Sequence, residues 1–143
     1  MGGLTAANGT VSAKTITQTS DLTRKNILSY DPQFSVRDIA NAPIAYFTWR
    51  EGRDTTSQHL GSIAQYWSLL APECVHGTEG NDMSMEYATL GLVTSIINAR
   101  EIVRIADQAT ATDSRLNAAL QRIADLEAEV AALHSRLGDL QPG

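Results

Sequence analysis

The chain has 143 residues, enough for one ordinary domain, and 43% of them are hydrophobic, which argues against wholesale disorder. A net charge of -5 with only two lysines argues against a nucleic-acid partner, because phosphate binding needs clustered Lys and Arg. The single cysteine excludes an intrachain disulfide framework, and no apolar run approaches the ~20 residues of a membrane span. We therefore expect neither a nucleic-acid nor a membrane partner.

Residues 1–20 are rich in Gly, Thr, Ser, Ala and Asn and show no helical period. β-branched residues are dense in their second half, and Lys14 carries the one formal side-chain charge. This composition predicts either a disordered tail or an extended arm that becomes ordered on a neighbouring protein. The low charge favours the anchoring arm, with Val11 and Ile16 as the candidate anchoring residues.

Residues 21–81 are predicted to form a small N-terminal domain with short helices and a strand. A first helix is expected from Asp21 to Tyr30, capped by Asp21 and stopped by the Asp-Pro pair that follows it. A second is expected from Ser35 to Asn41, where Ser35 and Asp38 have the spacing of a capping box. The apolar and aromatic stretch from Ile44 to Trp49 predicts a strand.

A third helix is expected from Asp54 to Leu70, ending at Ala71-Pro72, and a loop from Cys74 to Asn81. The aromatic residues of this region are interpreted as core or subunit interface: Tyr46, Phe47, Trp49, Tyr66 and Trp67. Cys74 and His76 lie two residues apart, but a metal site or an activated thiol needs further groups that the sequence does not place beside them. We therefore expect no cofactor, no metal and no enzymatic activity.

The third predicted domain, residues 82–143, is a long helix that begins near Asp82 and continues into a coiled coil. Its apolar stripe changes register between Ile97 and Ile102, which indicates a local change of supercoil. The segment from Thr110 to Ser114 contains poor helix formers and good caps. This segment leaves two alternatives open, a continuous helix and a helix that breaks there.

From Ile102 to Leu140 the a and d positions of consecutive heptads are apolar or small, and Thr112 is the only polar residue among them. A seven-residue period sustained this long predicts a coiled coil rather than an amphipathic helix on a core. The seam is the set of predicted oligomerisation residues Ile102, Ile105, Leu116, Ile123, Leu126, Val130, Leu133, Leu137 and Leu140. A single helix cannot bury this seam by itself, so the chain is expected to associate with copies of itself.

The residues around the seam favour a parallel assembly. Arg122 at a g position is placed to meet Glu127 at an e position of a parallel neighbour. Alternating Ile or Val at a with Leu at d is typical of two strands, whereas Leu120 at an e position widens the apolar stripe toward a third. We expect a parallel trimer, with a dimer as the alternative.

This layout resembles small phage structural proteins, such as head fibres, decoration proteins and fibre adaptors, which join a polar N-terminal arm to a compact domain and a parallel trimeric coil. The resemblance is one of architecture and covers the whole chain. It implies a virion component held on a capsid or tail protein by residues 1–81. The coil ends in Gly-Asp-Leu-Gln-Pro-Gly with no receptor-binding head, which argues against host recognition by this chain.

The expected fold is mainly α, with a small mixed N-terminal region, an extended arm and a long C-terminal helix. The expected function is that of a non-enzymatic structural protein in a bacteriophage virion assembled in the host cytoplasm. The alternative is a cytoplasmic coiled-coil adaptor or regulator that recruits a partner helix.

Overall fold

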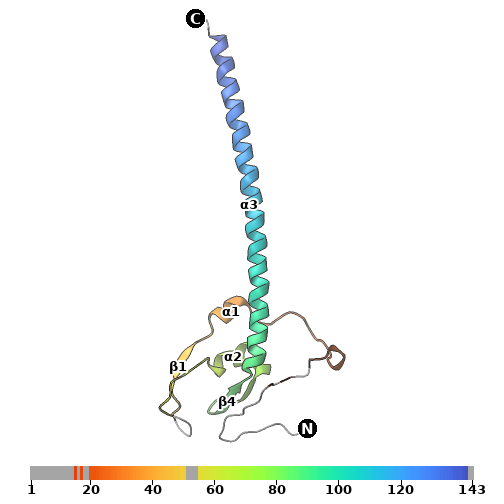
Figure 1. Ribbon diagram of the computed structural model, residues 1–143, viewed down its shortest axis with the longest axis vertical. Helices are drawn as coiled ribbons and strands as arrows, with labels where there is room; N and C mark the ends of the chain where they lie inside the picture. Colours follow the sequence, from red (N-terminus) through yellow and green to blue (C-terminus); the bar gives the residue numbers. More distant parts are fainter. Residues whose placement is uncertain (1–14, 16, 18–19, 51–54, 142–143) are drawn as a thin grey trace. The chain divides into compact units, whose positions relative to one another are not determined.

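The structure is a computed structural model that describes residues 15, 17, 20–50 and 55–141 (Figure 1). Contacts within the chain divide it into two units, Met1–Asp31 and Pro32–Gly143. The described residues are mainly helical, and a long C-terminal helix follows a small region with strands, as the sequence predicts. Val11 and Ile16, the predicted anchoring residues, lie outside the described residues.

In the described part of the first unit, regular structure is confined to a short 3-10 helix, η1 (Leu22–Arg24). Asp21 is its N-cap, and its Oδ1 accepts a hydrogen bond of 2.9 Å from the backbone N–H of Thr23. The prediction of a helix reaching Tyr30 is wrong beyond Arg24. An isolated helix of this length is unstable unless it buries an apolar face, and the apolar side chains of this stretch are exposed.

The second unit begins with helix α1 (Val36–Ala40), which has the predicted capping box. The backbone N–H of Ser35 donates to Asp38 Oδ2 over 2.7 Å, and the backbone N–H of Asp38 donates to Ser35 Oγ over 3.3 Å. Together with the Ser35 hydroxyl, the first of these bonds lowers the pKa of Asp38. Both partners lie within one helical turn, which is why the local sequence is sufficient to predict this helix.

Strand β1 (Ala45–Phe47) pairs antiparallel with β2 (His59–Gly61), with Tyr46 opposite Leu60. The predicted helix over residues 54–70 is therefore wrong in its first half, and helix α2 (Ala64–Leu70) forms only the second half. Ser62 stands at the change from strand to helix. Its hydroxyl donates to the Pro43 carbonyl oxygen over 2.7 Å and accepts from Trp67 Nε1 over 2.9 Å. These bonds tie the start of α2 to the segment before β1.

The core of the second unit lies around Trp67, which is buried with Ala71 and Leu90. The ring of Phe34 meets Trp67 edge-on with 6.0 Å between ring centroids, and Tyr66 OH donates to the carbonyl oxygen of Asp38 over 2.6 Å. The aromatic residues that the sequence predicts as core or interface do not lie together. Tyr66 and Trp67 belong to this core. Phe47 and Trp49 form a separate pair 5.2 Å apart that His59 joins, whereas Tyr46 is exposed.

After the short 3-10 helix η2 (Pro72–Cys74), the predicted loop from Cys74 to Asn81 is instead part of a hairpin. Strand β3 (Val75–Thr78) pairs antiparallel with β4 (Asn81–Met85). Glycine is needed at Gly77, because its φ is +86° and a Cβ there would lie 2.9 Å from the Asp82 carbonyl oxygen. Gly80 has a φ of +78° in the turn. The two glycines, which are also typical of a loop, thus provide the positive φ angles that this tight, irregular hairpin adopts.

Helix α3 (Tyr87–Leu140) is 54 residues long, or about 80 Å at a rise of 1.5 Å per residue (Figure 1). It begins five residues later than predicted, because Asp82 lies in β4. The predicted alternative of a break between Thr110 and Ser114 is wrong, since both hydroxyls donate to carbonyl oxygens one turn earlier within the helix. None of the described helices combines the length and apolar character that crossing a membrane would require.

Candidate functional site

The candidate site is the seam on α3. Leu90 and Ile97 near the helix start are buried in the second unit, whereas every residue from Ile102 to Gln141 is exposed. The seam residues are large and apolar, yet their exposed fractions range from 41% at Leu126 to 78% at Leu140. The structure thus places all nine predicted oligomerisation residues on one helix, in a region that makes no core with the rest of the described chain. An apolar surface of this extent is typical of an interaction site.

A shallow hollow of about 400 Å³ lies on the seam. It is open to solvent and is lined by Ile123, Leu126, Glu127, Val130, Ala131 and His134. These residues belong to consecutive turns of α3. Ile123, Leu126 and Val130 belong to the seam, Glu127 and His134 lie beside it at e positions, and Ala131 lies beyond them at a b position. A side chain from a second helix would fill such a hollow in the way that a knob fills a hole.

Charged side chains flank the seam. Arg122, predicted to meet Glu127 of a neighbour, lies 3.9 Å from Glu129 of its own helix. Both groups are exposed, so this pair contributes little to the stability of a single chain. Nearer the start of α3, Arg104 Nε donates to Glu101 over 2.8 Å, and these hydrogen bonds lower the pKa of Glu101.

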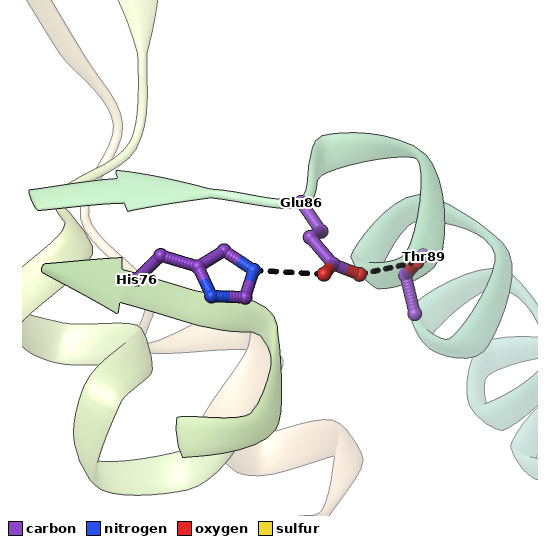
Figure 2. Close-up of polar contacts among 3 residues, drawn as sticks. All are labelled: His76, Glu86 and Thr89. Atoms are coloured by element: carbon purple, nitrogen blue, oxygen red, sulfur yellow. Dashed lines mark hydrogen bonds and ion pairs between the residues drawn. The ribbon is translucent and has the colours of Figure 1, made fainter. Parts of the chain in front are cut away.

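The start of α3 has a polar contact that sequence reasoning missed (Figure 2). Glu86 is the residue before the helix, and its Oε1 lies 2.8 Å from His76 Nε2 on β3. Its other oxygen accepts from Thr89 Oγ1 over 2.9 Å. These bonds, His76 first, lower the pKa of Glu86. The sequence signal was an acidic residue with a threonine three positions later, at the end of the hairpin.

Cys74 does not combine with His76 into a reactive site. Burial raises the pKa of the Cys74 thiol, and the nearby carboxylates of Glu86 and Glu73 raise it further. A thiol held in its protonated form is a poor nucleophile and a poor metal ligand. The imidazole of His76 is engaged by Glu86 instead. Among the described residues, no group of three or more His, Cys, Asp or Glu side chains is arranged to hold a metal ion.

Neither protein-family models nor curated proteins give a match to this sequence. The candidate site therefore stands on the chemistry and geometry of the chain's own residues.

Proposed function

We propose that this chain is a non-enzymatic structural protein that assembles through α3 as a parallel homotrimeric coiled coil. The observation that carries the proposal is the exposed seam. Burying a large aliphatic side chain is worth roughly 1.5–3 kcal/mol, and the seam holds nine of them in register. A continuous helix presents them in one line, so copies of the chain can bury them together along about 60 Å.

Three strands are favoured over two by the width of the apolar surface. Leu120 at an e position is 54% exposed beside the seam and adds to its apolar surface. A third helix covers e positions that a dimer leaves at the rim. A dimer remains the alternative oligomeric state.

The proposed role is to project this coil from a larger particle. Residues 1–81 would hold the chain on a capsid or tail protein, and the coil would extend from it as a head fibre or decoration protein does. Support comes from the separation of buried and exposed regions along the chain. The compact core ends near Ile97, and the exposed part of α3 begins at Ile102. The protein would then be found in a virion assembled in the host cytoplasm.

The second candidate function is a cytoplasmic adaptor whose seam recruits a helix of a different protein. It is favoured by the small residues Ala109, Thr112 and Ala119, which weaken self-association in the first half of the seam. The two functions differ in what the purified chain does alone: the structural protein forms a homotrimer, and the adaptor stays monomeric until its partner is added.

The test compares two substitutions that add the same charge to neighbouring positions of α3. Leu126→Asp places an unpaired carboxylate at a d position of every strand, which is costly to bury. Ala124→Asp places it at a b position, on the outer side of the helix. We expect sedimentation to show monomer or aggregate for Leu126→Asp and the native oligomer for Ala124→Asp. An oligomer that survives Leu126→Asp at micromolar concentration would contradict the coiled coil.

Anchoring is tested by deleting residues 1–19. This deletion is expected to leave the oligomer intact and to abolish attachment to the parent particle, because ordering an arm needs a sizeable contact surface on another protein. Normal attachment of the shortened chain would show that the arm has no anchoring role.

A further inference from the structure

The first third of α3 has two flanks that differ in their surroundings. One flank packs against the core of its own chain: Leu90 and Ile97 are buried, and Val93 and Thr94 are half-buried. The other flank, here called the outer flank, consists of Leu92, Ile96 and Val103. Their spacings of four and seven residues place them on one face of the helix. Their exposed fractions are 63%, 43% and 59%.

The heptads of the seam define what these flanks face in an assembly. Because α3 is unbroken across the register change between Ile97 and Ile102, positions counted back along the helix from the seam place Leu90 and Ile97 at c, Val93 at f and Thr94 at g. Leu92 falls at an e position, and Ile96 and Val103 fall at b positions. In a parallel coiled coil the g side of each helix lies beside the e side of its neighbour. The compact part of each chain, which occupies its own c and g side, is thereby brought to the neighbour's outer flank.

We propose that the compact region of one subunit, formed by residues 32–50 and 55–85, packs on the outer flank of the adjacent subunit. This inference rests on the proposed parallel coil and identifies a second contact between the same subunits. The contact is heterologous, because two different surfaces of the chain meet, and rotation about the coil axis closes it into a ring. The oligomer is then held together at its base as well as along the seam.

The chemistry of the outer flank suits a buried contact. Between Leu92 and Val103 its remaining e position is occupied by Ala99, so no charged side chain would lose its hydration when the flank is covered. Exposed in a single chain, three large aliphatic residues within three turns of helix form a patch that a partner surface can bury. A compact region of the same protein is present beside it in every assembled copy.

The test measures thiol reactivity with a small maleimide at three positions, in the full chain carrying Cys74→Ser. Leu133→Cys reports on the seam, Ile96→Cys reports on the outer flank, and Ala124→Cys is the matched control at a b position of the free coil. We expect Leu133→Cys and Ile96→Cys to react about tenfold or more slowly than Ala124→Cys. When Leu126→Asp is added, Ile96→Cys should react as fast as the control, with the fluorescence of Trp67 showing that the compact region is still folded.

Each contrary outcome has a distinct meaning. If Leu133→Cys is protected and Ile96→Cys reacts at the control rate, the coil exists and the second contact does not. If Ile96→Cys stays protected in the Leu126→Asp chain, the flank is covered by its own chain, which also refutes the inference. If Leu133→Cys reacts at the control rate, the proposed coil fails, and the inference fails with it.

Discussion

His76 Nε2 lies 2.8 Å from Glu86 Oε1, and this contact joins the hairpin to the residue that begins the long helix (Figure 2). A carboxylate oxygen can only accept, so the imidazole Nε2 carries the proton of this hydrogen bond. The Glu86 backbone N–H also donates to the Cys74 carbonyl oxygen over 2.9 Å. Side chain and backbone of one residue thus hold the first turn of α3 to η2 and β3, which sets the direction in which the rod leaves the compact region.

The first prediction concerns acid stability. Because the hydrogen bond from His76, followed by that from Thr89, lowers the pKa of Glu86 from its ordinary value of 4.5, the unfolded chain takes up this proton before the folded chain does. The stabilisation from this contact is complete above the pKa that Glu86 has in the unfolded chain. It is lost as the pH falls through the lower pKa that Glu86 has in the folded chain. The melting temperature, measured by tryptophan fluorescence, should therefore fall more between about pH 5 and about pH 3 in the wild type than in Glu86→Gln.

The control for this measurement is Glu79→Gln, which removes an exposed carboxylate from the turn of the same hairpin. Its acid dependence should match that of the wild type. An identical pH dependence of wild type and Glu86→Gln would mean that the contact in Figure 2 contributes nothing to stability.

The second prediction concerns the polar residue in the seam. Thr112→Leu replaces a hydroxyl at a d position with a larger aliphatic side chain and is expected to stabilise the oligomer by about 1–2 kcal/mol per chain. Thr110→Leu makes the same change at a b position, which faces outward, and should have little effect. Thermal melting followed by helical circular dichroism measures both. Equal effects of the two substitutions would place position 112 outside the seam.

The third prediction separates the two parts of the second unit. Trp67, Ala71 and Leu90 form the core without any residue beyond Gln108. A chain truncated after Gln108 is therefore expected to assemble more weakly and to keep Trp67 buried, with blue-shifted fluorescence from that residue. Red-shifted emission from both Trp67 and Trp49 would mean that the compact region cannot fold without the coil.

Elements specified by neighbouring residues could be predicted from the sequence, and elements specified by distant ones could not. The capping box of α1 lies within four residues, and its prediction is confirmed. Strand β2 was predicted as helix because His59, Ile63 and Tyr66 have helical spacing. Its true partner, β1, lies more than ten residues away. The hairpin of β3 and β4 was missed for a related reason, since glycines in a short polar segment are equally typical of loops.

The seam could be predicted because a heptad repeat is a property of the sequence alone. Its continuation through Thr110 to Ser114 needed the structure, which shows the helix unbroken there. The outer flank could not be predicted because Leu92 and Ile96 lie between Leu90 and Ile97 along the chain and are equally apolar. Only the packing of the core on one side reveals that the other side is uncovered.

The central claim, self-assembly through the seam, is tested most directly by the mass of the purified full-length chain in sedimentation equilibrium at micromolar concentration. A parallel homotrimer predicts three times the 15.4 kDa of one chain, and Leu126→Asp should replace that mass with the mass of a single chain or with aggregate. A wild-type mass of one chain, unchanged by raising the concentration, would contradict the account and favour the adaptor that needs a partner helix.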